Sequence, residues 1–302
     1  MRQLICAACL AAMPLAMIMP PCAFAAAVTA DFTATDLAAE EGKFAAYSVK
    51  HGMRAAFIEF FAEKSWLLRP ELVDAQTWLQ GRPDPPIVLD WKSQRTILSS
   101  SGDMGFSTGP SIFRRKPKPD TPDLPAFHGN FFSIWQKQQN GRWKVLVDHG
   151  ISNEPTATPN ALPATPLIAR DLPAQKNGTV VPAEDAEQKF IAAGKNINAA
   201  YQGVITAETR LLRDEQLPID GMAAIADFLR SQEGRWSWTV KLQGSSRAND
   251  FAYAVGNYLW QPKDGAARKG QYVRVWVRDA ASKSPRWTLA ADVLTPAPPP
   301  KT

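Results

Sequence analysis

The sequence predicts an α+β fold built from two similar units, and three observations lead to this prediction. Residues 129–148 hold two apolar runs, rich in aromatic and β-branched residues, on either side of a polar loop with Asn140-Gly141. This pattern is typical of a β-hairpin. Residues 270–276 and 287–292 repeat the arrangement, and each hairpin follows a stretch of helical periodicity. Helices followed by an antiparallel meander, twice in one chain, indicate an α+β arrangement.

Apolar periodicity and helix-breaking residues predict the helices and strands of the first half, in chain order. Apolar residues at helical spacing predict helix over residues 36–63, with a break at Gly52 because glycine weakens a helix interior. Residues 82–86 contain three prolines and interrupt regular structure. Residues 87–101 predict a strand that enters a turn, and the glycines at 102 and 105 are followed by another strand before the hairpin.

The second half has the same order of elements. Helical patterns cover residues 183–202 and 222–232, and strand patterns cover 236–242 and 251–260. Asp103 lies twelve residues after Trp91, as Asp250 lies twelve after Trp238. Further matching positions are Phe131 with Tyr272, Ser133 with Arg274, Trp135 with Trp276, Trp143 with Trp287, and Asp148 with Asp292. Such repetition indicates two units of one architecture.

A chain of 302 residues is long enough for two domains, each with its own core. We predict a signal peptide over residues 1–25, a first domain over 31–150 and a second, more divergent domain over 183–295. Between the domains, residues 151–182 are rich in proline and predict a semi-extended linker. Residues 296–302 predict a disordered tail.

The first residues have the features of a secretory leader. Arg2 precedes an apolar run over residues 4–19, and Ala23-Phe24-Ala25 offers a small-x-small cleavage site. All three cysteines lie in this segment, so cleavage after Ala25 leaves a chain without a thiol. In the alternative, Cys22 becomes a lipidated terminal residue, although the preceding Met-Pro-Pro fits that poorly. We expect an exported protein, periplasmic or secreted, with no stable membrane insertion after removal of the leader.

Composition and motifs exclude several classes of function. The net charge of +5 is small for this length, and the basic run at residues 114–119 is interpreted as a solvated loop. No aromatic residues interleave that run, so no nucleic-acid partner is predicted. The sequence has no phosphate-binding glycine loop, nucleophile elbow or dinucleotide fingerprint, and its three histidines lack metal-site spacing. We therefore predict no cofactor and no metal.

The motifs together resemble a known superfamily. They are Ser101-Gly102-Asp103-Met104-Gly105-Phe106, Gly129-x-Phe131-x-x-x-Trp135, Asn140-Gly141-x-Trp143 and Val147-Asp148-His149. Residues 40–150 resemble a SnoaL-like domain of the nuclear transport factor two-like (cystatin/ketosteroid-isomerase-like) superfamily, and residues 184–294 resemble it more weakly. The resemblance implies two cone-shaped, curved antiparallel sheets, each wrapped around its N-terminal helices, with a pocket at the mouth. Some relatives are cyclases or isomerases and many are non-catalytic, so the fold does not decide the function.

Aromatic residues are candidates for both core and ligand contacts. The candidate ligand-binding residues are Trp91, Phe106, Phe131, Trp135 and Tyr253. Because the tryptophans recur in both halves, a shared core explains them better than a shared ligand. Strict alternation along the closing strand places Trp143, Val145 and Val147 on one face and Asp148 on the other.

Histidines without a counterpart in the second half lead the candidates for catalysis. The three histidines, His51, His128 and His149, all lie in the first half. A lyase or isomerase needs a base and an electrophilic partner, which His128 with Asp148 or Asp90 could supply, and His149 is a further candidate. In the competing interpretation, both His128 and His149 lie at strand ends, where exposed positions are common.

Two functional classes remain. The first is an exported, non-catalytic tandem domain that binds a small apolar or amphipathic molecule, or a protein partner. The alternative is a small-molecule lyase, isomerase or cyclase that uses acid–base residues of the first domain. In either case we expect an intramolecular pseudo-dimer. Its outer sheet faces would carry Phe132, Ile134 and Leu146 in one unit and Val273, Val275 and Val277 in the other.

Overall fold

The computed structural model describes residues 31–69, 71–116, 125–154, 161–174, 182–278 and 286–298. The described residues from Phe32 onward group into one compact unit. The predicted signal peptide lies outside the described residues. So do residues 117–119 of the basic run, residues 155–160 and 175–181 of the predicted linker, and residues 299–302 of the predicted tail.

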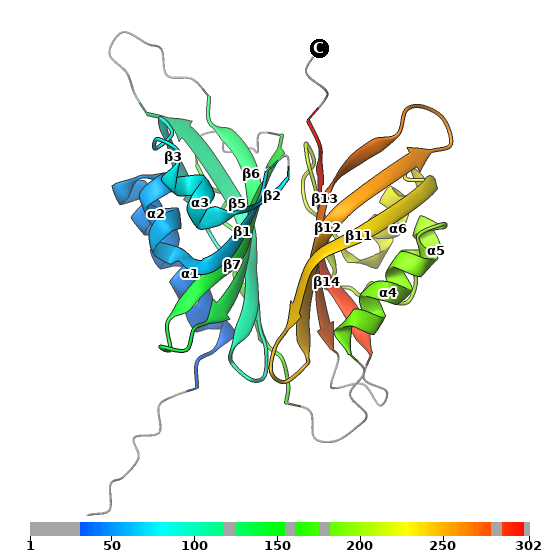
Figure 1. The fold of residues 1–302 in the computed structure, drawn as a ribbon, viewed down its shortest axis with the longest axis horizontal. Helices are drawn as coiled ribbons and strands as arrows, with labels where there is room; N and C mark the ends of the chain where they lie inside the picture. Colours follow the sequence, from blue (N-terminus) through cyan, green and yellow to red (C-terminus); the bar gives the residue numbers. More distant parts are fainter. Residues whose placement is uncertain are drawn as a thin grey trace, which may run out of the picture. The chain divides into compact units, whose positions relative to one another are not determined.

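Two sheets, each with helices on one face, make up the fold (Figure 1). The first half contains α1 (Ala34–His51), α2 (Met53–Phe60), β1 (Phe61–Leu68), β2 (Leu72–Asp74), α3 (Ala75–Gln80), β3 (Ile87–Trp91), β4 (Arg95–Leu98), β5 (Met104–Arg115), β6 (Phe127–Lys137), β7 (Trp143–Asn153) and β8 (Ile168–Asp171). The second contains α4 (Ala183–Ala193), α5 (Ile197–Tyr201), β9 (Arg210–Arg213), β10 (Ile219–Asp220), α6 (Gly221–Arg230), β11 (Gly234–Ser245), β12 (Phe251–Pro262), β13 (Arg268–Arg278) and β14 (Trp287–Pro296). The predicted α+β class is confirmed.

Both sheets have the same central order. The first runs β2-β1-β7-β6-β5-β4-β8, with β3 also paired to β5, and the second runs β10-β9-β14-β13-β12-β11. In each sheet an early strand, β1 or β9, lies parallel to the last strand of the meander, β7 or β14. The meander strands themselves pair antiparallel. This shared order is consistent with two tandem domains.

The first helix begins after a capping box that was not predicted from the sequence and ends at the predicted break, Gly52. Thr33 and Asp36 form a capping box, in which each side chain binds the backbone N–H of the other. Gly52 separates α1 from α2 with a φ of 94°, and a Cβ there would lie 2.6 Å from the Asp84 carboxylate. The predicted helix over residues 36–63 is too long, because Phe61 begins β1 and pairs with Val145 of β7.

The range predicted as a linker contains regular structure at two places. Residues 151–153 complete β7, where Asn153 pairs with His128. Ile168–Asp171 form β8, which pairs in parallel with β4. The proline content of this range therefore does not prevent short strands from forming at the sheet edge.

Three clusters of buried apolar residues lie among the described residues. One lies between the first sheet and its helices and includes Phe44, Phe57, Trp91, Trp135, Trp143 and Val145. A second lies between the second sheet and its helices and includes Phe190, Trp238, Trp276, Trp287 and Leu289. The third, which we call the outer-face cluster, joins residues of both sheets and includes Phe132, Ile134, Val147, Val273, Val275 and Val277, with Leu146 packed against it.

Polar contacts between the two halves border the outer-face cluster. The Asp250 carboxylate accepts a hydrogen bond from the Ser100 backbone N–H at 2.9 Å. The Asp103 carboxylate accepts one from the Arg247 backbone N–H at 3.1 Å. Asp103 and Asp250 also accept hydrogen bonds from serine hydroxyls of their own turns, those of Ser101 and Ser246. Each aspartate thus orders its own turn and contacts the turn of the other half.

Candidate functional site

A cavity of about 260 Å³ lies in the first half, between the inner face of the sheet and α2. Its walls are mainly apolar and aromatic, and a few polar groups face into it. It is lined by Met53, Phe57, Arg69, Leu89, Trp91, Ser111, Phe113, Phe131, Asp148, His149 and Gly150. A concave, largely apolar site with a few convergent polar groups is the usual form of a small-molecule pocket. We call it the first cavity.

A β-bulge turns Asp148 toward this cavity. Ile134 pairs with Val147 but Trp135 pairs with Val145, so Leu146 is the extra residue in β7. Val145 consequently packs inside the first half, whereas Val147 belongs to the outer-face cluster. The prediction that Asp148 lies opposite Trp143 and Val145 is therefore wrong, because strict alternation does not hold across a bulge.

Glu41 of α1 anchors a hydrogen-bond network behind the cavity. Its side chain is fully buried, and it accepts hydrogen bonds from the indole N–H groups of Trp91 and Trp135, both at 2.7 Å. The Ser133 hydroxyl lies 3.5 Å from Glu41 Oε1 and 2.9 Å from Asp148 Oδ2. Ser133 thus lies between two carboxylates, one buried behind the cavity and one at its wall.

Burial dominates the electrostatics of both carboxylates. It raises the pKa of Glu41 to about 8, although the indole hydrogen bonds of Trp135 and Trp91 oppose the rise. It raises the pKa of Asp148 to about 7, against the Ser133 hydrogen bond and the charge of Arg69. A carboxyl that titrates near neutral pH can both accept and donate a proton. Asp148 is therefore the residue of the cavity wall best suited to acid–base chemistry.

Arg69 and His149 complete the polar part of the cavity wall. Arg69 follows β1 directly and donates from Nη1 to the Leu68 carbonyl at 3.0 Å. His149 hydrogen-bonds Thr295 of β14 through Nε2. Burial lowers the pKa of His149 to about 4, so this ring is neutral at physiological pH. The cavity wall therefore combines a permanent cation with a carboxyl of raised pKa, while the His149 ring is engaged by Thr295.

His128 and Asp90 lie away from this cavity. His128 pairs in register with Asn153, whereas Asp148 pairs with Ser133, so the two are five residues apart along β7, about 17 Å. His128 instead lines a separate cavity of about 210 Å³ with Asn130, Arg210 and other residues. The Asp90 carboxylate pairs with Arg114 at 3.4 Å on a partly exposed surface. The structure therefore does not bring His128 together with either predicted aspartate.

Both strand-end histidines are buried, contrary to the exposure considered from the sequence. His128 is 4% exposed and His149 is 5% exposed. The reason for His149 is that β7 continues to Asn153, and the reason for His128, second in β6, is that Ile112 of β5 and Asn153 of β7 pair with it on both sides.

The five aromatic candidates fall into three places. Trp91 and Phe131 line the first cavity. Trp135 is fully buried and contributes to the Glu41 network. Phe106 and Tyr253 belong to the outer-face cluster, on the opposite side of their sheets. Only the first two are thus placed to contact a molecule in the first cavity.

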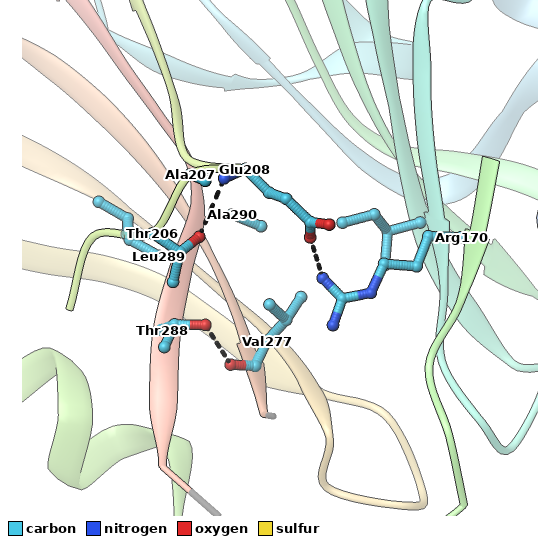
Figure 2. Close-up of a pocket in the computed structure, with 9 residues that line it drawn as sticks. Arg170, Thr206, Ala207, Glu208, Val277, Thr288, Leu289 and Ala290 are labelled. Carbon is cyan, nitrogen blue, oxygen red and sulfur yellow. Dashed lines mark hydrogen bonds and ion pairs between the residues drawn. The ribbon is translucent and has the colours of Figure 1, made fainter. Parts of the chain in front are cut away.

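A further cavity of about 300 Å³ lies between Arg170 of β8 and residues of the second half (Figure 2). Figure 2 shows its polar groups already engaged with one another: Arg170 forms an ion pair with Glu208, and Thr288 donates to the Val277 carbonyl. The Glu208 backbone N–H likewise binds the Thr206 hydroxyl. A ligand entering here would have to displace these contacts, so this cavity is a weaker candidate.

Two residues of the site were not singled out from the sequence, although signals for both existed. Glu41 lies four residues after Leu37 and three before Phe44, so a charged side chain interrupts the apolar face of the predicted helix. Leu67-Leu68-Arg69 recurs as Leu211-Leu212-Arg213, which marks Arg69 as a repeated position. Within the described part of the chain, no group of three or more His, Cys, Asp or Glu is arranged to hold a metal ion. None of the described helices has the length and apolar character needed to cross a membrane.

Comparisons with known proteins concern the fold alone. No protein-family model and no curated protein matches the chain. Similar solved structures include an NTF2-like protein of unknown function from Shewanella oneidensis, with 16% identity, 37% of this chain and 94% of that chain covered, and a TM-score of 0.30. A ketosteroid isomerase-like protein from Erwinia carotovora has 17% identity, 41% and 99% coverage, and a TM-score of 0.33. An NTF2-like protein of unknown function in nutrient uptake from Rhodospirillum rubrum has 11% identity, 38% and 98% coverage, and a TM-score of 0.32.

These structures carry the names of the superfamily that the sequence motifs resemble. Each covers less than half of this chain. Similarity at this level does not bear on ligands or reactions.

Proposed function

We propose that the chain is an exported binding protein whose first cavity holds a small, mainly apolar molecule with one polar group. The observation that carries this proposal is the composition of the cavity wall. Six of its side chains are apolar or aromatic, namely Met53, Phe57, Leu89, Trp91, Phe113 and Phe131. The charged groups Arg69 and Asp148 also line it, and the charge of Arg69 acts on Asp148. The apolar walls would supply affinity, and the polar groups would orient the ligand.

Export rests on the sequence of residues 1–25, with its apolar run and its small-x-small cleavage site. A binding protein outside the cytoplasm would have no thiol after cleavage, which suits an oxidising compartment. A protein partner is the less favoured ligand, because the first cavity is concave and has the volume of a small molecule rather than a flat surface.

Probe binding tests the proposal directly. The neutral fluorophore N-phenyl-1-naphthylamine should bind the purified chain, and its fluorescence emission should increase. The fluorescence of Trp91, which lies in the cavity wall, should be quenched. Ser111→Phe should block binding, because Ser111 lines the cavity and the larger side chain would occupy it. The Ser111 hydroxyl has no hydrogen-bond partner among the described residues, so the substitution removes no such contact. Ser237→Phe, on an exposed position of β11, is the matched control and should bind normally. Equal binding by the two variants would contradict the assignment of the site.

A second candidate function is acid–base catalysis, as in a lyase or isomerase. The observation in its favour is that Asp148 lines the first cavity with a pKa of about 7. Arg69 would then polarise the substrate, since the His149 ring binds Thr295 and His128 lies at another cavity. Native mass spectrometry of the purified chain would identify a bound molecule, and proton exchange of that molecule in D₂O would report turnover. Exchange that persists in Asp148→Asn would exclude Asp148 as the base.

A further inference from the structure

One arginine, Arg274, is buried in the interior of the second half. The guanidinium of Arg274 donates from Nη1 to Glu187 Oε1 at 2.7 Å, and its Nε lies 3.5 Å from Asp292 Oδ2. Its central carbon lies 3.9 Å from the ring centroids of both Phe190 and Trp238. The side chain is fully buried. The second half thus encloses a cation between two carboxylates and aromatic rings, an arrangement that stabilises buried positive charge.

The glutamate of this arrangement has a counterpart in the first half. The Trp276 indole donates to Glu187 Oε2 at 2.8 Å, as the Trp135 indole donates to Glu41 Oε2 at 2.7 Å. Glu187 belongs to α4 and Glu41 to α1, the first helix of each half. Glu41 and Glu187 therefore occupy corresponding places.

The aspartates correspond as well. In β14, Ala290 is the extra residue of a bulge, since Val275 pairs with Ala291 and Trp276 with Leu289. The same bulge at Leu146 precedes Asp148 in β7. In register, Asp292 lies opposite Arg274.

At the same place in the first sheet, Asp148 lies opposite Ser133. Both carboxylates are thus common to the two halves, and Ser133 stands where the second half has Arg274.

Each half also has an arginine at the end of its first sheet strand, and this arginine lies near the aspartate. Arg213 donates from Nη1 to the Leu212 carbonyl at 3.0 Å, which repeats the contact of Arg69 with Leu68. Arg213 lies 3.7 Å from the Asp292 carboxylate. Arg69 is therefore matched by Arg213, and among the charged groups of these clusters the one without a counterpart is Arg274. The first half has the same two carboxylates with one positive charge fewer.

We propose that the first cavity binds an organic cation, an ammonium or guanidinium group on a small apolar body, whose charge contacts Asp148 and replaces the missing guanidinium. This inference rests on the proposed function of the cavity and specifies its ligand. Trp91 and Phe131 in the cavity wall stand at the positions of Trp238 and Tyr272, which flank Arg274 in the second half. Aromatic faces of this kind attract cations.

The raised pKa values of Glu41 and Asp148 are those expected of buried carboxyls that lack a neutralising cation. Burial raises the pKa of both Glu41 and Asp148 toward or above neutrality. The groups that face Asp148 are Ser133 of β6, Arg69 after β1 and, behind Ser133, Glu41 of α1, while His149 is neutral. A bound cation would favour the ionised carboxyls, so binding should release protons near neutral pH and tighten as pH rises toward about 8.

Three probes with the same phenyl ring test the charge preference. Benzylguanidinium, neutral benzyl alcohol and anionic benzoate would be titrated into the full chain and followed by calorimetry at about pH 8. We expect the cation to bind about tenfold or more tightly than the alcohol, as a charge-assisted hydrogen bond would allow, and benzoate to bind most weakly. Calorimetry in buffers of different ionisation enthalpy should detect proton release for the cation alone.

Two variants locate the preference at the carboxylates. Ser133→Arg reproduces the second half in the first, so its own guanidinium should occupy the site and abolish the preference for benzylguanidinium. Asp148→Asn keeps the shape of the side chain and should lower affinity for the cation about tenfold, so that the preference for the cation over benzyl alcohol is lost. If Ser133→Arg fails to fold, Asp148→Asn alone decides the question.

The outcomes separate this inference from the proposed function. Tight binding of benzyl alcohol with no preference for the cation, or a preference that survives Asp148→Asn, would overturn the cation assignment while the cavity remains a binding site. If no probe binds the full chain, both the cation assignment and the proposed function fail.

Discussion

Ser133 and Arg274 occupy corresponding positions in the two sheets and differ in charge. Each lies in register with a buried aspartate, and each lies two residues before a tryptophan whose indole binds a helix glutamate. Arg274 neutralises its two carboxylates directly, whereas the Ser133 hydroxyl only hydrogen-bonds between its two. The cation at position 274 is therefore one difference between the charge-balanced carboxylates of the second half and those of the first, where one carboxyl lines a cavity.

Removal of the buried cation should destabilise the second half. Arg274→Met leaves Glu187 and Asp292 buried without it, which should cost about 3–5 kcal/mol of the free energy of unfolding. Chemical denaturation followed by tryptophan fluorescence measures the loss. Ser133→Ala is the matched control in the first half and should cost about 1 kcal/mol, because it removes one neutral donor. Equal midpoints for the two variants would show that Arg274 does not balance these carboxylates.

The stability of the chain should depend on pH through Asp148. Its pKa is raised in the folded state from 3.8 to about 7, so the folded protein holds this proton more tightly than the unfolded chain. The resulting stabilisation is complete below about pH 4 and is lost as pH rises to about 7. The free energy of unfolding of the wild type, relative to Asp148→Asn, should therefore fall across this window. A difference that stays flat from pH 4 to 7 would contradict the raised pKa.

Substitution of His128 should affect stability but not binding in the first cavity. The side chain is buried at another cavity, so His128→Ala should lower the free energy of unfolding by about 1–3 kcal/mol. Binding of the naphthylamine probe to folded protein should be unchanged. Loss of probe binding without loss of stability would instead place His128 in the ligand site.

Light scattering tests the proposed intramolecular pseudo-dimer. The outer-face cluster buries apolar residues of both sheets within one chain, and the Asp103 and Asp250 contacts flank it. If this pairing within one chain is the state in solution, the mature protein should have the mass of one chain at low micromolar concentration. A stable species of twice that mass would indicate that the outer faces pair between chains.

Intact-mass measurement of protein collected outside the cytoplasm tests the proposed export. Cleavage after Ala25 should give a chain that begins at Ala26 and does not react with thiol reagents, because the three cysteines lie before the cleavage site. A product that retains Cys22 with an attached lipid would support the alternative of a membrane-anchored lipoprotein.

Local chemistry accounts for the parts of the fold that could be predicted. Gly52 divides the first helical region because its φ of 94° does not suit other residues. Gly141, with a φ of 80°, closes the turn of the first hairpin. The repeated order of helices and meander strands follows from periodicity, which depends only on neighbouring residues.

The candidate site was predicted only in part. Asp148, His149, Trp91 and Phe131 were candidates and do line the first cavity, whereas His128, Asp90, Phe106 and Tyr253 do not. The pairing of His128 with Asp148 failed because the strands extend further than their apolar cores suggest, which separates the two residues along β7.

The sequence by itself determined the α+β class, the two hairpins, the recurrence of Ser133 as Arg274 and the shared aspartates. These features are encoded in local periodicity and in matching positions along the chain. Only the tertiary structure decided that Asp148 faces the cavity and that Glu41 lies behind it. A bulge at Leu146 reverses the alternation of side chains without a mark in the apolar pattern. The Glu41 network joins residues more than ninety positions apart, and such contacts form only when helix and sheet pack together.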